Sequence, residues 1–402
     1  MREIFTTRRR VIATITAVVA TAALGGSAVL PAEAAPAVGS VLHEDSPHGI
    51  DNSYLVLLKR SAGFRAASKE GGQFAAKYGA SVERTYDSAV NGYAVHVSSA
   101  GARSLATDPA VAFVEKNQKV SLDATQTNPP WGLDRIDQAN RPLSRTYTYP
   151  NTAGSGASVY VIDTGVRITH RQVVGRAVYG YDAVDRDNVA ADGNGHGTHV
   201  ATTVAGTTYG AAKATRIVAV RVLDNSGAGT IAGVIAGVDW VTSHRVGPAV
   251  ANMSLGGGAS TALDTAVSNS IASGVTYAVA AGNSNVNAAN TSPARVGAAI
   301  TVGASTSTDY RAGYSNYGSV LDLFAPGSSI PAGWHTSDTA TATLSGTSMA
   351  TPHVAGAAAI YLTSHPAASP ATVQSALVNG ATRGVLRNTG TGSPNRLLRV
   401  IP

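Results

Sequence analysis

From residue 159 onward, short apolar runs rich in β-branched residues alternate with longer stretches whose composition favours helices. A helix between successive strands is the connection that a parallel sheet requires, and it places helices on both faces of that sheet. The sequence therefore predicts an α/β fold with a doubly wound, mostly parallel sheet. The predicted strands are residues 159–163, 217–223, 250–253, 276–281 and 299–302, and the predicted helices include residues 231–244 and 263–273.

Three polar residues stand where such elements begin or end. Asp163 closes a buried apolar run, at the end of a strand where open α/β sheets build their sites. His196 lies where a glycine-rich loop meets a small-residue helix, and Ser348 lies where a small-residue turn meets a helix that extends to about residue 364. A serine hydroxyl becomes nucleophilic only with a base in reach and a third group that orients the base. Taken singly, the aspartate could be a turn former and the histidine structural, but together they predict nucleophilic catalysis.

The order Asp163, His196, Ser348 and the motifs around these residues resemble the subtilisin superfamily, and more closely its proteinase K-like branch. The resemblance covers about residues 124–400. It implies a serine endopeptidase in which Ser348 is the nucleophile, His196 the base and Asp163 the orienting acid, acting through an acyl-enzyme, with His199 as a structural neighbour. It also implies that the side chain of Asn283 assists an oxyanion hole.

The same resemblance implies a cleft with two glycine-rich edges, residues 226–229 and 254–257, between which a peptide lies as an added strand. A first pocket near Leu255 and Ala280 would be apolar and wide, so we expect a broad preference for apolar or aromatic residues before the cut. The expected substrate-binding residues are Gly227, Ala228, Gly229, Ser254, Leu255, Gly256, Ala280, Ala281 and Gly282.

The first 123 residues predict a leader followed by a separate small domain. Three arginines, an apolar run and an Ala-x-Ala site are typical of a secretory signal peptide over residues 1–35, with a membrane anchor as the alternative.

Residues 36–123 are expected to form a propeptide. Its core, about residues 52–121, has a β-α-β-β-α-β, ferredoxin-like order that resembles the inhibitor I9-type prodomain of subtilases. Such a prodomain is the chain's own partner, since it assists folding and then inhibits; an accessory domain is the alternative reading. Within it we expect strands at residues 54–58, 93–97 and 111–115 and helices at 64–78 and from 101. The catalytic domain is expected at residues 124–402, after a polar linker at 121–130 that is cut to release the enzyme.

Composition limits the chemistry that the chain can use. It has no cysteine, which excludes disulfides, thiolate zinc sites and a thiol nucleophile. Its net charge is +6, but the basic residues of the later part are scattered, so a nucleic-acid groove is not expected. We expect a secreted monomer that acts on polypeptides, without a membrane span once the leader is removed.

Calcium is the expected structural cofactor, and no cofactor is expected for catalysis. By the resemblance, the carbonyls of Gly297 and Ala299 and the carboxylate of Asp322 would bind one ion. A weaker second set is Asp134, Asp137 and Gln138, where Ser144 and Thr146 occupy positions at which relatives offer stronger ligands.

The sequence departs from the family pattern at one position, and two alternative functions remain. The family usually has glycine where this chain has Thr202, so the geometry of the histidine helix is open. An α/β-hydrolase esterase would place its serine first, within Gly-x-Ser-x-Gly, whereas Ser348 comes last and its motif ends in Ala350. An inactive subtilase fold serving as a scaffold is the other alternative. The natural substrate, the cleavage point and the export route are not specified by the sequence.

Overall fold

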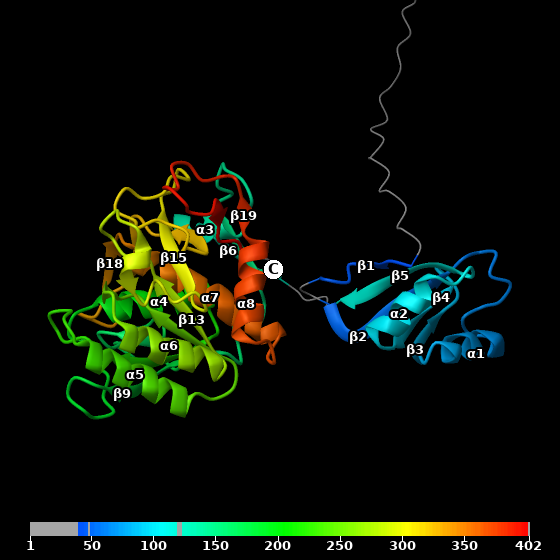
Figure 1. The fold of residues 1–402 in the computed structure, drawn as a ribbon, viewed down its shortest axis with the longest axis horizontal. Coiled ribbons are helices and arrows are strands. Elements are labelled where there is room, and N and C mark those ends of the chain that lie inside the picture. The colour runs from blue at the N-terminus through cyan, green and yellow to red at the C-terminus, as the bar shows by residue number, and fades with distance from the viewer. Residues whose placement is uncertain (1–38, 47–48, 119–122, 401–402) are drawn as a thin grey trace, which may run out of the picture. The chain divides into compact units, whose positions relative to one another are not determined.

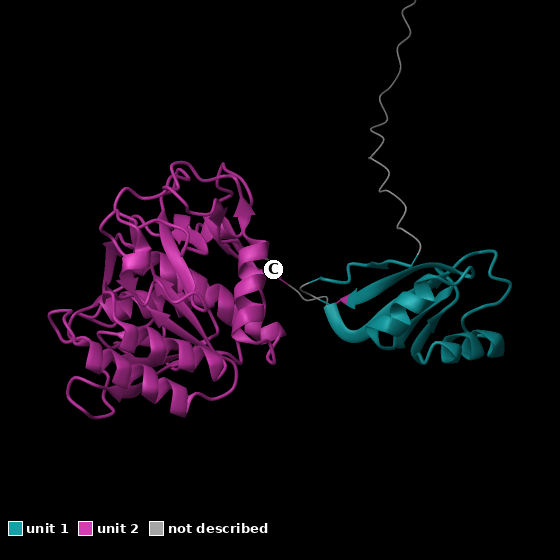
Figure 2. Cartoon of the chain, in the orientation of Figure 1, with its two compact units in different colours: residues 1–117 teal, residues 118–402 magenta. Residues whose placement is uncertain are grey.

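The computed structural model describes residues 39–46, 49–118 and 123–400, and the chain divides into two compact units, residues 1–117 and 118–402 (Figure 2). The predicted signal peptide, residues 1–35, lies outside the described residues. Across the part of the chain that is described, no helix combines the length and the apolar character needed to cross a bilayer.

The larger unit is built on a nine-stranded sheet (Figure 1). Its strands are parallel except for the terminal pair β19 and β20, which is antiparallel. In spatial order they are β19 (Thr382–Arg383), β20 (Arg396–Leu397), β16 (Leu323–Pro326), β15 (Ile300–Ser305), β13 (Val275–Ala280), β11 (Ala249–Met253), β8 (Ser158–Asp163), β10 (Arg216–Arg221) and β9 (Ala177–Asp182). The α/β prediction and all five predicted strands are confirmed. Sequence reasoning missed β9, β16, β19 and β20.

Helices cover both faces of this sheet, so successive residues of β8 enter different cores. Val159 and Val161 pack in the core that contains residues of α4 (His196–Ala205), α7 (Thr347–Ser364) and α8 (Pro370–Gly380). Tyr160 and Ile162 pack in the core that contains residues of α5 (Ile231–His244) and α6 (Thr261–Ala272). Full burial of one such aliphatic side chain contributes about 1.5–3 kcal/mol, so β8 is held from both sides.

The helices differ in how they begin. Thr230, Ser260 and Ser369 cap α5, α6 and α8 by accepting a hydrogen bond from a backbone N–H of the first turn. By contrast, α4 and α7 begin after Gly195 and Gly346, and neither has a side-chain cap. Side chains from outside each helix accept hydrogen bonds from its first turn instead: Thr164 and Asp192 for α4, and Asn283 for α7.

Short antiparallel pairs complete the larger unit. They are β6 (Asp123–Thr127) with β7 (Thr146–Pro150), β12 (Gly257–Gly258) with β14 (Thr291–Ser292), and β17 (Ile330–Gly333) with β18 (Thr341–Leu344); α3 (Trp131–Ile136) and the short helix η1 (Ala288–Asn290) lie between them in the sequence. The linker expected at 121–130 is thus partly wrong, because residues 123–127 form a strand. The alternating polar residues of this segment pair with the complementary Thr-Tyr-Thr-Tyr strand.

The smaller unit has one sheet in the order β1-β5-β2-β4-β3. Its elements along the chain are β1 (Val41–Leu42), β2 (Gly49–Leu58), α1 (Lys69–Lys77), β3 (Ser81–Tyr86), β4 (Gly92–His96), α2 (Ser99–Ala106) and β5 (Val111–Gln118). The expected β-α-β-β-α-β order is confirmed. The first helix is shorter than expected because it begins at Lys69, where Ser68 caps it.

Candidate active site

Asp163 and His196 meet at the carboxyl end of β8. Asp163 is the last residue of that strand and is fully buried, and His196 is the first residue of α4. Nδ1 of His196 lies 2.7 Å from Oδ1 of Asp163, which also accepts a hydrogen bond from the backbone N–H of Thr164 over 2.8 Å. The aspartate therefore holds the imidazole through Nδ1 and leaves Nε2 available to another group.

Opposing effects act on the pKa of His196. Burial is the largest and lowers the pKa, because the charged imidazolium loses water. The charge of Asp163, its hydrogen bond and the charge of Asp192 raise the pKa, and together they outweigh burial, so the pKa lies above its usual value of 6.5. The imidazolium is thus retained to a higher pH than in a free histidine.

The loop before His196 is held by Asp192, which the sequence analysis did not single out. Both oxygens of its carboxylate accept hydrogen bonds from this loop and from the end of β8. The donors are the backbone N–H groups of Asn194, Gly195 and Thr198 and the hydroxyls of Thr164 and Thr198, at 2.6 to 2.9 Å. An aspartate before Gly-Asn-Gly is a known turn signal, and it could have identified this role.

Ser348 lies in the first turn of α7, beside the residue that follows β11. Its Oγ donates a hydrogen bond to the Ser254 carbonyl over 3.0 Å, and Oγ of Ser254 donates to the Ser348 carbonyl over 2.9 Å. Ser254 and His196 line the same cavity, and β11 is adjacent to β8 in the sheet. The structure thus brings all three residues to one edge of the sheet. Within the described residues, however, the Ser348 hydroxyl bonds to Ser254 and not to His196.

A small space beside Gly346 is bordered by two N–H donors. Oδ1 of Asn283 accepts hydrogen bonds from the backbone N–H and the hydroxyl of Thr347, over 2.8 and 3.0 Å, and this contact leaves its Nδ2 for other partners. A Cβ added to Gly346 would lie 3.5 Å from this Nδ2 and 3.6 Å from the backbone nitrogen of Ser348. The absence of a side chain at Gly346 keeps this space open between the two donors.

Asn316 positions the turn that carries Asn283, and the sequence analysis missed it. It is 1% exposed; its Nδ2 donates to the Ala281 carbonyl and its Oδ1 accepts from the backbone N–H groups of Ser284 and Val286, over 2.8 to 3.1 Å. Gly282 has a φ of 104°, and a Cβ there would lie 2.4 Å from Nδ2 of Asn316, so the turn requires glycine. No local pattern links Asn316 to this turn, because the two are far apart along the chain.

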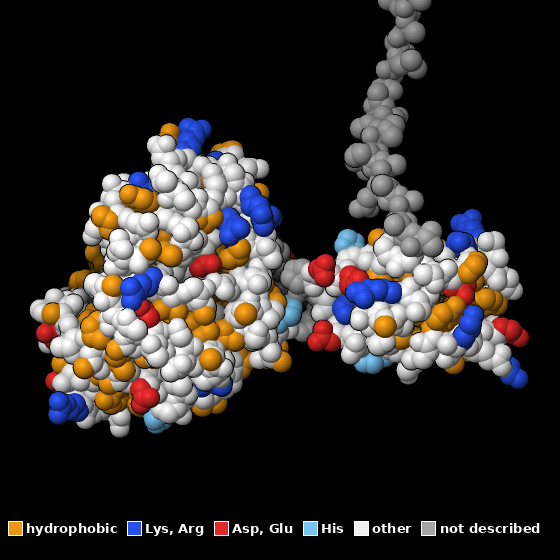
Figure 3. Space-filling model, in the orientation of Figure 1, with side chains coloured by type: hydrophobic (Ala, Val, Ile, Leu, Met, Phe, Trp, Pro, Cys, Tyr) orange, Lys and Arg blue, Asp and Glu red, His pale blue; other side chains and the backbone are white. Residues whose placement is uncertain are grey.

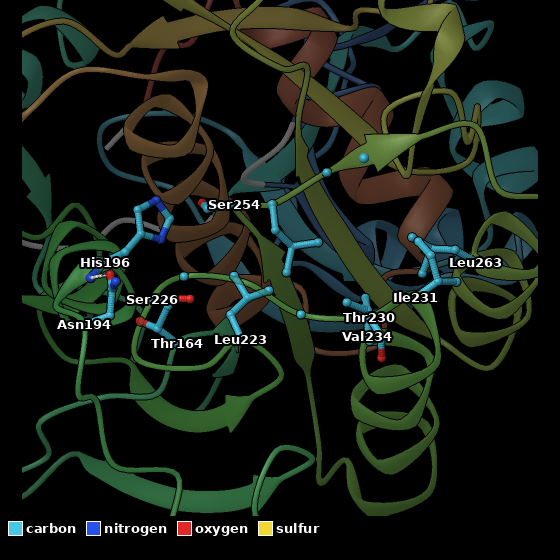
Figure 4. Close-up of a pocket in the computed structure, with 15 residues that line it drawn as sticks. Thr164, Asn194, His196, Leu223, Ser226, Thr230, Ile231, Val234, Ser254 and Leu263 are labelled. Carbon is cyan, nitrogen blue, oxygen red and sulfur yellow. Dashed lines mark hydrogen bonds between the residues drawn. The ribbon is translucent and has the colours of Figure 1, made fainter.

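A cavity of about 480 Å³ opens beside His196 (Figure 4). Figure 4 places His196 and Asn194 at one end of it and Ile231 and Leu263 at the other. Of the expected substrate-binding residues, Gly227, Gly229, Ser254, Leu255 and Gly256 line it, whereas Ala228, Ala280, Ala281 and Gly282 are not among its lining residues. Sequence reasoning missed the apolar end, formed by Leu223, Ile231, Val234 and Leu263.

The first expected calcium set comes together around the side chain of Gln374 on α8. Nε2 of Gln374 lies 3.3 Å from the Gly297 carbonyl oxygen, 3.2 Å from the Ala299 carbonyl oxygen and 3.1 Å from Oδ1 of Asp322. Burial raises the pKa of Asp322 to about 6. Three oxygens thus converge on one atom, and oxygen ligands of these types are those that calcium prefers. The set therefore fits a calcium ion.

The second expected set faces N–H donors instead. The carboxylate of Asp134 accepts hydrogen bonds from the backbone N–H and hydroxyl of Ser144 and the backbone N–H of Arg145, over 2.8 to 3.1 Å, and Oε1 of Gln138 also accepts from Ser144. Burial raises the pKa of Asp137 to about 6. The donors to Asp134 include two backbone N–H groups, which cannot turn away as the side chain of Gln374 can, so this set fits a cation poorly. In the described ranges, no group of three or more His, Cys, Asp or Glu side chains could hold a metal ion.

Thr202 fits its buried position without distorting α4. Its hydroxyl donates to the Thr198 carbonyl over 2.8 Å and accepts from the backbone N–H of Gly333 over 2.8 Å. A Cβ at Gly333 would lie 2.9 Å from the methyl group of Thr202, so glycine there makes room for the branched side chain. The threonine therefore ties α4 to β17.

Two further histidines lie buried on the helices of the site. Nε2 of His199 lies 3.0 Å from the Ile330 carbonyl oxygen, and Nδ1 of His353 lies 2.9 Å from the Met349 carbonyl oxygen. Burial lowers the pKa of each to about 4. Both are therefore neutral near pH 7.

A parallel α/β sheet with an Asp-His pair and a helix-borne serine at one edge is the arrangement of a serine hydrolase with the subtilisin order of residues. Comparison with known proteins makes this specific. Residues 154–397 match the subtilase family of peptidases, and residues 35–123 match the peptidase inhibitor I9 family. The chain belongs to the subtilase family and is a serine endopeptidase with an inhibitor-type prodomain, which makes the full chain a zymogen.

Similar proteins agree with this family. The chain is 56% identical over 320 residues to an extracellular serine proteinase of Thermus sp. (strain Rt41A), covering 80% of this chain and 78% of that protein. It is 48% identical over 363 residues to alkaline serine exoprotease A of Vibrio alginolyticus, covering 87% of this chain and 67% of that protein. The crystal structure of a cold adapted subtilisin-like serine proteinase superposes with a TM-score of 0.67 at 54% identity, covering 69% of this chain and 100% of that one.

Proposed function

We propose that Asp163, His196 and Ser348 form the catalytic triad of this endopeptidase. Oγ of Ser348 attacks the carbonyl carbon of a peptide bond while Nε2 of His196 takes its proton. His196 then donates that proton to the leaving amine, and water, activated by the same imidazole, hydrolyses the acyl-enzyme. Asp163 accepts a hydrogen bond from Nδ1 of His196 and fixes the imidazole in place. The observation that carries this proposal is the 2.7 Å contact between Nδ1 of His196 and Oδ1 of Asp163.

The Ser348 hydroxyl must turn from Ser254 to His196 before it reacts. The Ser254 carbonyl belongs to one edge of the cleft, where a bound peptide would donate a backbone N–H to it. A peptide that takes this acceptor releases the Ser348 hydroxyl, and a rotation about χ1 between staggered rotamers is sufficient to redirect it. Catalytic hydrogen bonds are often incomplete in free enzymes and form with substrate, which is consistent with this step.

The oxyanion is stabilised in the space beside Gly346. Nδ2 of Asn283 and the backbone N–H of Ser348 border it, and the uncapped start of α7 adds its positive end. Thr347 fixes the amide of Asn283 by two hydrogen bonds to Oδ1. These donors are in place before charge develops on the substrate oxygen.

The cleft binds extended polypeptide with a broad preference for apolar or aromatic residues before the cut. The glycines at its edges allow close approach of backbone to backbone. Its far end adds a second apolar surface, made by Leu223, Val234 and Leu263, that a further substrate side chain can fill. Peptides that differ only in the residue before the cut test this: a strong preference for charged residues over Phe or Leu would contradict it.

A calcium ion held by Gly297, Ala299 and Asp322 would stabilise the larger unit, and it takes no part in catalysis. These oxygens belong to the loop before β15 and to the residue before β16, so an ion would join two neighbouring strands of the sheet. The set around Asp134 is left out of this proposal because backbone N–H donors, which are fixed in place, face it.

The chain is made as a secreted precursor that cuts itself. Residues 1–35 direct export, and the relative from Thermus is named as extracellular, which supports this. The prodomain assists folding of the larger unit, inhibits it and is removed near Ala124. Ala124 lies in β6, opposite Tyr149 of β7, so the new N-terminus stays paired with the larger unit after the cut.

Labelling the purified enzyme with a serine-directed phosphonylating reagent tests the triad. We expect loss of activity in step with one label per molecule, found on Ser348 by peptide mass spectrometry. N-terminal sequencing of the same sample locates the maturation point. A label on another residue, or full activity after complete labelling of Ser348, would reject the assignment.

A further inference from the structure

Gln374 is the only side chain among the described residues whose hydrogen bonds reach all three of the oxygens assigned to calcium. Val373 and Leu377 of the same helix are buried in the core shared with α7, which fixes the rotation of α8. This rotation places Gln374 toward the loop before β15 and toward Asp322. Three segments that are far apart in the sequence are therefore joined through one amide group.

An amide N–H and a calcium ion compete for the same lone pairs. Both present positive charge to the oxygens, and Nε2 of Gln374 lies where the three oxygens converge, which is the place that an ion bound by all three at about 2.3–2.6 Å would need. The bonds of Gln374 are long, at 3.1 to 3.3 Å, and one NH₂ group has two hydrogens for three acceptors. They are therefore individually weak and can be exchanged for an ion.

We propose that Gln374 is an intramolecular competitor for calcium. Its amide holds the Gly297, Ala299 and Asp322 oxygens together when no ion is bound, and it must leave them before an ion can bind. The side chain thus lowers calcium affinity and, in exchange, preserves the stability of the calcium-free protein. This inference rests on the proposed calcium site and is independent of the catalytic triad.

Calcium binding and thermal unfolding of the full chain test this competition. The Ser348→Ala background prevents self-digestion without touching the calcium set. Gln374→Ala removes the amide while keeping a strong helix former. Since calcium no longer has to displace these hydrogen bonds, we expect calorimetry to show calcium binding about three- to tenfold tighter in Gln374→Ala. In the presence of a chelator, the same variant should melt at a lower temperature than its parent. Addition of calcium should therefore raise the Tm of the variant by more than it raises the Tm of the parent.

Matched variants separate this effect from general damage to α8. Asn379→Ala removes an exposed amide from the same helix and should change neither calcium affinity nor Tm. Gln374→Asn keeps an amide but shortens it by one methylene, so it should behave like Gln374→Ala and replaces it if that variant does not fold. Asp322→Asn should abolish calcium binding at this site in either background.

The outcomes are distinct. Unchanged calcium affinity in Gln374→Ala would overturn the proposal, and weaker affinity would also overturn it by showing that Gln374 is a ligand through Oε1. If neither the parent nor Gln374→Ala binds calcium in a manner that depends on Asp322, both this inference and the calcium site are wrong. The assignment of Ser348 would be unaffected, because labelling tests it separately.

Discussion

The larger unit has a hydrophobic core on each face of its main sheet, whereas the smaller unit has a single hydrophobic core. In β8 of the larger unit, residues 159–162 are all buried, alternately in two cores. In the smaller unit, β3 has no buried residue, and one cluster contributed by the strands and by α1 and α2 forms the core. A small domain with a single core is only marginally stable. The unit that carries the candidate active site is therefore built on the more completely buried sheet, and the prodomain on the less buried one.

The two units also differ in their surfaces and spectroscopic probes. On the face visible in Figure 3, the Lys and Arg side chains of the larger unit are scattered among neutral and apolar ones. All three tryptophans of the chain, Trp131, Trp240 and Trp334, belong to the larger unit. Tryptophan fluorescence therefore reports unfolding of the larger unit alone, and circular dichroism reports both.

The largest effect is expected for Ser348→Ala, which separates activity from folding. We expect kcat to fall by about a millionfold, the loss measured for the same change in subtilisin itself. Both units should still fold, and the precursor should remain uncut. Peptide hydrolysis, tryptophan fluorescence and electrophoresis of the secreted chain check these points. A folded variant with normal peptidase activity would refute the role of Ser348.

Each of the two buried histidines should contribute a loss of stability to the larger unit as the pH falls. The folded pKa of His199 and of His353 is about 4, below the usual 6.5, so the unfolded chain binds protons first as the pH falls. Their contribution is fully present above pH 6.5, is lost as the pH falls from 6.5 to 4, and is about 3 kcal/mol for each residue. Urea unfolding of the Ser348→Ala chain, followed by tryptophan fluorescence between pH 8 and pH 4, measures it. Asp137 and Asp322, whose folded pKa values of about 6 exceed the usual 3.8, act in the opposite direction over this range in both chains. The test is therefore a difference: between pH 8 and pH 4, His353→Gln should lose about 3 kcal/mol less stability than its parent, and an equal change in the two chains would count against the assignment.

Two asparagines offer a matched comparison between the units. Asn283→Ala should lower kcat by about a hundred- to a thousandfold, the range known for loss of this donor in subtilisin, and should destabilise the larger unit by about 1–3 kcal/mol because the Thr347 N–H loses its acceptor. Asn91 of the smaller unit bonds to the Ala66 N–H and the Phe64 carbonyl over 2.8 and 3.0 Å. Asn91→Ala should destabilise that unit by about 1–3 kcal/mol and leave the kcat of the mature enzyme unchanged. Rates of the mature enzymes and circular dichroism melting of the precursors check both; the reverse pattern would show that the roles are misassigned.

The smallest shift in a pH profile is expected for Asp192→Asn, although this change also weakens the loop before His196 because an amide NH₂ replaces one of the two accepting oxygens. The charge of Asp192 is one of the effects that raise the pKa of His196, so its removal should move the acid limb of the kcat/KM profile to lower pH, by less than about one unit. Asp239→Asn, which removes an exposed charge from α5 of the same unit, should not move this limb. An acid limb that stays in place in Asp192→Asn would show that this charge does not act on His196.

Sequence reasoning succeeded where a pattern was local and failed where contacts joined distant segments. The apolar runs of β8, β10, β11, β13 and β15 are continuous in the sequence, and each was predicted. The two-residue strands β19 and β20 have no such run and were missed. Asn316 was missed for a related reason, since it orders the turn at Asn283 from a separate loop.

Local pattern was sufficient for the α/β architecture and the prodomain order, because periodicity is a property of neighbouring residues. The prediction of Asp163, His196 and Ser348 as a triad came from the resemblance of their motifs to the subtilisin superfamily. The folded chain was needed to show that the Ser348 hydroxyl bonds to Ser254, that the cleft ends in an apolar surface at Leu263, and that Gln374 reaches the oxygens around Asp322. These contacts depend on how helices rotate and pack against the sheet. Packing is a sum over many distant side chains, and no short stretch of sequence encodes it.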